Sequence, residues 1–282
     1  MSYPVYGRFQ APEPQNALAE LHVHNGQELK TASHVSPLAI LDQSDLLAQG
    51  IHCSKFIPGC HTDPDALGSC TANATTGFMA WLLDELEFLT FGHRLVNGDP
   101  EHAPTSLDDA AGGERTAISF YHACSSQTGD PSTEWPPTDC GSSGPYIVKE
   151  LESMDEIAGA KIAHDPTSLC SLLQDGPVLI GSPFLQAWET PSAGSAIVDG
   201  DGSARSLEAQ IRQGIAGGHE TLIETIETIK IGPHGVDPFG TILGVRNSWS
   251  KSWGDEGRYR IHLSTLAMLG SYIDYRQPYI HP

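Results

Sequence analysis

The sequence predicts an α+β fold, because its predicted helices precede its predicted strands along the chain. Apolar side chains recur near helical spacing between residues 70 and 91, and Gly92 follows as a stop signal. Further helices are predicted over residues 145–154 and 166–173. Short apolar runs predict strands over residues 177–181, 220–231, 241–245 and 257–262. Helices followed by a run of strands are typical of an α+β domain.

Two of these elements carry a local irregularity. The first turns of the helix over residues 70–91 contain three threonines and Gly77, so packing rather than intrinsic propensity must hold them. In the strand over residues 220–231, apolar and polar residues do not alternate strictly, which indicates a bulge or burial on both faces. Residues 97–115, 125–145 and 192–203 are rich in turn residues and are predicted to be loops.

Composition limits the classes of partner. The 282 residues carry 15 Lys and Arg against 35 Asp and Glu, a formal net charge of −20, which argues against nucleic acid and anionic membranes. No apolar run reaches the roughly 18 to 20 residues of a membrane span. The start of the chain has no charged region followed by an apolar run, so we expect no secretory signal. These features favour a cytoplasmic or particle-associated protein.

Six cysteines leave several interpretations open. Without Cys70 five remain, an odd number that cannot all pair internally, so free thiols are the default. Disulfides between Cys53 and Cys60, or between Cys124 and Cys140, are alternatives. Histidines flank the first pair, but its spacing is wider than that of structural zinc sites. We therefore predict no metal and no cofactor.

Three short segments together predict nucleophilic catalysis by a thiol. Small residues precede Cys70 at the head of a predicted helix, His219 follows two glycines, and Asn247 precedes Ser248 and Trp249. A thiol attacks a carbonyl only as thiolate, and a helix N-terminus and an imidazolium both lower its pKa. An amide that is hydrogen-bonded to the imidazole nitrogen away from the thiol fixes the tautomer of the ring. An indole shields that hydrogen bond from water.

These segments resemble the papain family of cysteine peptidases. The resemblance rests on Leu67-Gly68-Ser69-Cys70-Thr71-Ala72-Asn73-Ala74, on Gly217-Gly218-His219, and on Val245-Arg246-Asn247-Ser248-Trp249-Ser250-Lys251-Ser252-Trp253-Gly254-Asp255. The first segment is similar to the form found in many microbial and viral members. His219 follows Cys70 by 149 residues, near the upper end of the roughly 130 to 150 that papain-like enzymes show. Asn247 lies 28 residues further on, which predicts an enlarged hairpin between two strands.

The resemblance implies a two-lobed fold with the site in a cleft. Residues 1–50 would be an N-terminal extension, either a propeptide or, as we expect, an ordered arm. Residues 51–282 would form the catalytic domain, with a helical lobe over about 51–175 and an antiparallel β lobe over about 176–282. Cys70 would be the nucleophile, His219 the proton carrier, Asn247 its orienting amide and Trp249 the shield.

Two positions depart from the family pattern. The family usually has a glutamine six residues before the nucleophile, whose amide stabilises the oxyanion together with the backbone N–H of the cysteine. Here that position is Pro64, so the Cys70 N–H is the one donor that the resemblance assigns and the second donor is unknown. Glu220, directly after His219, would either pair with the imidazolium or face solvent.

The leading hypothesis is a peptidase that cleaves peptide or protein substrates, cell-wall peptides among them, through a thioacyl-enzyme. The alternative is a catalytically weak or inactive papain-fold binding or structural protein, for example in a virion or another assembly, with an assembly partner in place of a substrate. Acyl transfer by the same triad is a third hypothesis.

Overall fold

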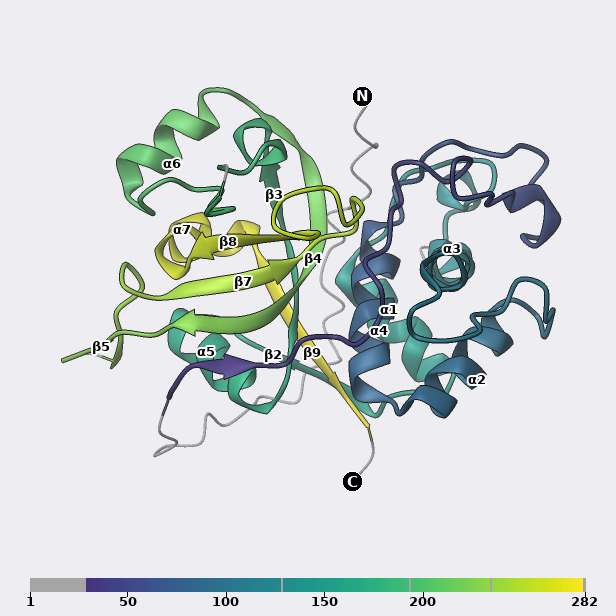
Figure 1. The fold of residues 1–282 in the computed structure, drawn as a ribbon, viewed down its shortest axis with the longest axis horizontal. Helices are drawn as coiled ribbons and strands as arrows, with labels where there is room; N and C mark the ends of the chain where they lie inside the picture. The colour runs from purple at the N-terminus through teal and green to yellow at the C-terminus, as the bar shows by residue number, and fades with distance from the viewer. Residues whose placement is uncertain (1–28, 128, 193, 234, 281–282) are drawn as a thin grey trace.

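The computed structural model describes residues 29–127, 129–192, 194–233 and 235–280, which form two lobes side by side (Figure 1). The helical lobe contains α1 (Cys70–Leu82), α2 (Glu85–Leu95), α3 (Ala110–Ser126) and α4 (Gly144–Ser153). The β lobe carries the helices α5 (Pro166–Asp175), α6 (Ala204–Ile211) and α7 (Leu263–Leu269) around an antiparallel sheet. The α+β prediction, with a helical lobe and a β lobe, is confirmed.

The sheet of the β lobe is antiparallel throughout and has the strand order β2-β9-β3-β4-β7-β8, with β1 paired to β4. Its strands are β1 (Ala32–Ser33), β2 (Gly159–Ile162), β3 (Val178–Leu185), β4 (Ile215–Thr228), β7 (Ile242–Arg246), β8 (Arg258–His262) and β9 (Asp274–Tyr279). A separate hairpin of β5 (Ile231–Gly232) and β6 (Gly235–Val236) lies between β4 and β7 in sequence. This hairpin is the predicted enlargement before Asn247.

Strand β4 is longer than predicted and is irregular. It begins at Ile215, five residues before the predicted start, and its pairing with β7 shifts between Ile223 and Thr225 and again between Ile226 and Thr228. The predicted bulge is therefore confirmed. Strand β3 likewise extends past the predicted residue 181 to Leu185. These extensions follow from long-range pairing, since β3 pairs along its whole length with Ile215–Ile223 of β4.

Packing holds α1, as its composition predicts. All of its residues from Cys70 to Ala80 are buried, and the hydroxyls of Thr75 and Thr76 donate to backbone carbonyls one turn earlier. A Cβ at Gly77 would lie 3.4 Å from Nε of Arg246 at the end of β7, so the glycine lets the helix approach the sheet closely. Helix α1 thus joins the two lobes through its contacts with β4.

The prediction of one helix over residues 70–91 is wrong. Leu83 is extended and Asp84 starts a new helix with a capping box, in which Glu87 N–H donates to Asp84 Oδ1 at 2.9 Å and Asp84 N–H donates to Glu87 Oε2 at 3.1 Å. Gly92 does not stop this helix, which continues to Leu95. A Cβ at Gly92 would lie 2.5 Å from Cγ of Pro104, so this glycine serves close packing.

Three helices, α3, α6 and α7, lie where no helix was predicted. Helix α3 occupies the end of the predicted loop 97–115 and continues to Ser126, and its N-cap Asp109 accepts from Gly112 N–H at 2.8 Å. Its two early glycines argue against a helix locally, but α3 packs against α1 in the core of the helical lobe. Helix α6, capped by Ser203, follows the predicted loop 192–203.

The described part of the predicted N-terminal extension packs on both lobes. Strand β1 pairs with β4, and Leu38, Leu41 and Leu46 belong to the apolar core of the helical lobe. Arg246 donates to the carbonyl oxygens of Leu38 and Ala39. In Figure 1 this purple segment runs from β1 along the boundary between the lobes. Residues 1–28 lie outside the described residues, so the propeptide alternative is not tested there.

Within the described ranges, none of the helices combines the length and the apolar character that crossing a bilayer requires.

Candidate active site

Cys70 is the first residue of α1 and is fully buried. The turn before it is held by side chains: Asn73 Nδ2 donates to Ser69 Oγ at 2.9 Å, and Gly68 N–H donates to Asp139 Oδ2 at 2.8 Å. Tyr121 O–H donates to the other oxygen of Asp139 at 2.6 Å. The sulfur therefore sits at a fixed helix N-terminus, whose partial positive charge of roughly +0.5 favours a thiolate.

His219 and Asn247 are brought together by the pairing of β4 with β7. His219 lies near the start of β4, and Asn247 directly follows the last residue of β7. Nε2 of His219 is 2.7 Å from Oδ1 of Asn247, and Ser248 N–H donates to the same oxygen at 2.8 Å. Since an amide oxygen only accepts, Nε2 carries the proton of the neutral imidazole and Nδ1 is the basic nitrogen.

Aromatic rings enclose the imidazole. The ring of Trp249 lies 4.9 Å from that of His219 at an interplanar angle of 30°, and Phe184 meets the imidazole edge-on at 5.0 Å. His219 is only 1% exposed, and this burial lowers its pKa to about 4, against the raising effect of the Asn247 hydrogen bond. Trp249 thus packs against the imidazole, and burial favours the neutral form of the ring.

Cys70 and His219 come from the two different lobes. The helix that Cys70 begins packs against β4, the strand that carries His219. Cys70 and His219 are both buried at this junction between the lobes.

The carboxylate of Asp63, next to Pro64, has partners on a neighbouring segment. Asp63 accepts from Ser54 N–H at 2.9 Å, and its other oxygen lies 3.0 Å from Nδ1 of His52. The bonds to Ser54, followed by that to His52, lower the pKa of Asp63. Asp63 is therefore engaged with residues of its own loop, while Pro64 has no N–H to offer an oxyanion.

Glu220 is buried rather than exposed, so the solvent-facing alternative is wrong. It is 1% exposed, and it lines a small internal cavity together with Asn73, Arg246 and Asn247. The cavity's volume of about 10 Å³ is on the scale of one water molecule.

A large groove adjoins the imidazole on the side of Trp249. Its volume is about 780 Å³, and two indoles, those of Trp249 and Trp253, form part of its wall. Five carboxylate residues also line it: Asp42, Asp45, Asp65, Glu189 and Asp255. Among the described residues, its lining includes no Lys, Arg or His. This groove was not recognised from the sequence, because its walls come from segments that lie far apart along the chain.

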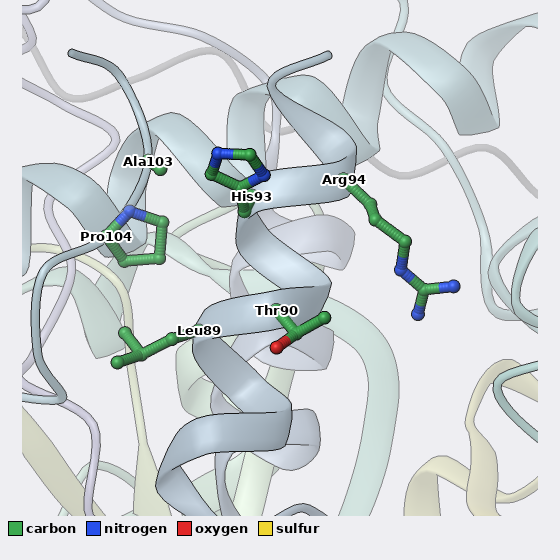
Figure 2. Close-up of a pocket in the computed structure, with 6 residues that line it drawn as sticks. All are labelled: Leu89, Thr90, His93, Arg94, Ala103 and Pro104. Atoms are coloured by element: carbon green, nitrogen blue, oxygen red, sulfur yellow. The ribbon is translucent and has the colours of Figure 1, made fainter. Parts of the chain in front are cut away.

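A second hollow, of about 300 Å³, lies on the helical lobe beside α2. Figure 2 shows Leu89, Thr90 and His93 on this helix and Pro104 on the neighbouring loop. Arg94 points away from that loop and forms an ion pair with Glu156. None of the three triad candidates lines this hollow.

The other cysteines form no disulfides in the structure. Cys53, Cys60, Cys124, Cys140 and Cys170 are free thiols in the structure, so the two disulfide alternatives are not formed. Burial raises the pKa of Cys53 and that of Cys170 to about 12, which makes both poor nucleophiles. Among the described residues, no three His, Cys, Asp or Glu side chains are grouped to hold a metal ion.

No protein-family model and no curated protein matches this chain. Among solved structures it is similar to xylellain, a cysteine protease from Xylella fastidiosa, at 14% identity over 99% of this chain and 97% of that chain, with a TM-score of 0.49. It is also similar to digestive procathepsin L 3 of Tenebrio molitor larval midgut, at 15% identity over 94% of this chain and 75% of that chain, with a TM-score of 0.42. A third similar structure is that of the bromelain protease from Ananas comosus in complex with the E64 inhibitor. The identity is 14% over 89% of this chain and 99% of that chain, with a TM-score of 0.41.

Proposed function

We propose that this protein is a cysteine peptidase in which Cys70, His219 and Asn247 form the catalytic triad. The observation that carries the proposal is the 2.7 Å contact between His219 Nε2 and Asn247 Oδ1, which leaves Nδ1 as the basic nitrogen. Thiol catalysis requires a cysteine together with a base. Here the base is held in one tautomer, and it lies at the junction where a cysteine begins a helix. The described part of the N-terminal extension acts as an arm of this catalytic unit.

The reaction follows from these roles. Nδ1 of His219 takes the proton of the Cys70 thiol, and the sulfur forms a bond to the substrate carbonyl carbon. The imidazolium then gives that proton to the leaving amine as the C–N bond breaks, which leaves a thioacyl-enzyme. Water, deprotonated by His219, attacks the thioester, the C–S bond breaks, and the thiol is restored as the acid leaves.

The Cys70 N–H supplies one contact to the oxyanion. Pro64 supplies none, and loss of one oxyanion donor costs on the order of 10² to 10³ in rate. We therefore expect slow turnover unless another group donates. Burial opposes the charge on His219, so the thiolate and imidazolium must stabilise each other as a pair.

The groove beside Trp249 suits an extended chain on the side of the leaving amine. Its volume of about 780 Å³ accommodates several residues of a peptide, whether from a protein or from a cell wall. The His219 imidazolium, which donates to that amine, packs against the indole that forms part of the groove's wall.

The test is the rate at which iodoacetamide alkylates Cys70 as a function of pH, read by peptide mass spectrometry. The wild type should react as a thiolate well below pH 7, and His219→Ala should shift that reactivity toward about pH 8.5, where an ordinary thiol ionises. Hydrolysis of unstructured protein substrates and cell-wall peptides should disappear in Cys70→Ser.

Two outcomes would favour the other hypotheses. An ordinary thiol profile in both proteins would support the catalytically weak binding or structural protein. Transfer of the acyl group to an added amine, in preference to water, would identify an acyl transferase.

A further inference from the structure

Gln43, in the segment between β1 and α1, is 1% exposed and uses every polar group it has. Its side-chain Nε2 donates to the Leu67 carbonyl at 3.1 Å, and its own carbonyl accepts from Leu67 N–H at 3.1 Å. Its N–H donates to the Ser248 carbonyl at 3.1 Å, and its Oε1 accepts from the Ser248 hydroxyl at 2.6 Å. One residue thus makes two hydrogen bonds to each of two distant segments.

Both of those segments lead directly to the triad candidates. Leu67 lies three residues before Cys70. Ser248 follows Asn247, and its N–H donates to the same oxygen that His219 contacts. Gln43 therefore connects the segment of the nucleophile with the segment that orients the base.

Neighbouring backbone bonds make this connection a short strap. Ser250 N–H donates to the Leu41 carbonyl at 3.1 Å on one side, and Leu46 N–H donates to the Asp65 carbonyl at 2.7 Å on the other. Backbone bonds of this kind are open to almost any residue. The two side-chain bonds are not, because they need a donor and an acceptor on one side chain of this length.

We infer that Gln43 is a positioning residue that sets the placement of Cys70 relative to the His219–Asn247 pair. This inference rests on the proposed function. Asp42 and Ser44 line the acidic groove, whereas Gln43 does not, so its side chain acts on geometry rather than on substrate contact. A misplacement of about 1 Å costs on the order of 10² in rate.

Gln43→Met tests the inference, because it keeps the length of the side chain and removes both side-chain hydrogen bonds. The matched control is Gln277→Met. Gln277 is 4% exposed, and its Nε2 donates to the Leu172 and Pro177 carbonyls at 2.9 and 3.2 Å, within the β lobe. Both variants lose a buried amide, but the control loses it away from the triad candidates.

We expect Gln43→Met to lower kcat by about tenfold to a hundredfold with KM within about twofold. It should also slow alkylation of Cys70 below pH 7. Gln277→Met should lower the free energy of unfolding without changing kcat or the pH profile of alkylation. Ser248→Ala removes one of the two side-chain bonds, is the milder variant if Gln43→Met does not fold, and should lower kcat less.

Equal effects of the Gln43 and Gln277 variants on kcat, or an unchanged kcat in a folded Gln43→Met, would overturn the inference. If the wild type shows no His219-dependent thiolate, the proposed function fails by itself. The strap is then tested by amide hydrogen exchange. Faster exchange of the Leu67 and Ser248 amides in Gln43→Met, but not in Gln277→Met, would support the strap. Unchanged exchange would refute it.

Discussion

Nε2 of His219 lies 2.7 Å from Oδ1 of Asn247, although the two residues are 28 positions apart in the chain. Ser248 N–H donates to the same oxygen, so a second hydrogen bond holds the Asn247 side chain in the orientation that contacts the imidazole. Both partners are buried, and Trp249 covers the imidazole. The contact therefore fixes which nitrogen is basic, and it does so away from solvent.

Replacing Asn247 should weaken catalysis through the orientation of His219. Asn247→Ala should lower kcat by about tenfold to a hundredfold, because the ring loses its fixed tautomer and plane. The Asn247 hydrogen bond raises the pKa of His219, so its loss should also move the acid limb of the rate profile to lower pH. Steady-state kinetics from pH 4 to 9 measure both effects.

Asn247→Asp is the matched comparison for that variant. Its carboxylate also accepts from Nε2–H, and its charge stabilises the imidazolium. The acid limb should therefore move to higher pH in this variant. Equal profiles for the two variants would show that Asn247 does not act on His219.

Glu114, on α3, should make the protein less stable as the pH rises. It is fully buried, and its Oε2 accepts from Asp42 N–H at 3.0 Å. Burial raises its pKa to about 8. A carboxyl whose pKa is raised on folding holds its proton in the folded state and loses it in the unfolded state. Stability then falls with increasing pH until the folded pKa is reached.

From pH 6 to pH 8 this change amounts to roughly 2–3 kcal/mol in the free energy of unfolding. Urea unfolding of the wild type should show the loss, and Glu114→Gln, which cannot ionise, should not. Glu152→Gln, at an exposed position on α4, should behave like the wild type. A wild-type free energy that is constant over this range would contradict the prediction.

The acidic groove beside Trp249 should favour substrates with basic residues on the leaving side of the scissile bond. Five carboxylates line it, with no basic residue in the part of the chain that the structure describes, so it attracts cations and repels anions. We expect kcat/KM to be about tenfold higher for Lys than for Glu on that side at low ionic strength. The difference should shrink as salt is added, since the Debye length falls to about 8 Å at 0.15 M.

Asp65→Asn removes one of these carboxylates and should reduce the preference for Lys by about two- to threefold. Asp108→Asn removes the same charge at an exposed position that does not line the groove, and should leave the preference unchanged. A preference for Glu, or the same response in both variants, would show that the groove does not select by charge.

The elements whose signals are local could be read directly from the sequence. Small residues before Cys70 and the apolar spacing after it indicated where α1 begins, and the apolar runs located β3, β4, β7 and β8 to within a few residues. The motif segments singled out Cys70, His219 and Asn247 before any geometry was known. Each of these signals lies within a few neighbouring residues.

The predictions of secondary structure were wrong where a local signal was absent or misleading. Apolar spacing continues across the break at Leu83, so it could not reveal the capping box at Asp84 that starts α2. The paired glycines at the start of α3 indicated a loop, but packing against α1 outweighs their low helix propensity.

The sequence by itself determined the α+β class, the start of the helix that Cys70 begins and the three residue types of the candidate triad. Tertiary structure alone decided the bond between His219 and Asn247, the acidic groove and the hydrogen bonds of Gln43. The physical reason is the separation along the chain of the residues that form these contacts. Gln43 bonds to residues 24 and 205 positions away, and contacts of that kind leave no periodicity or spacing along the chain, because they form only when the two lobes pack.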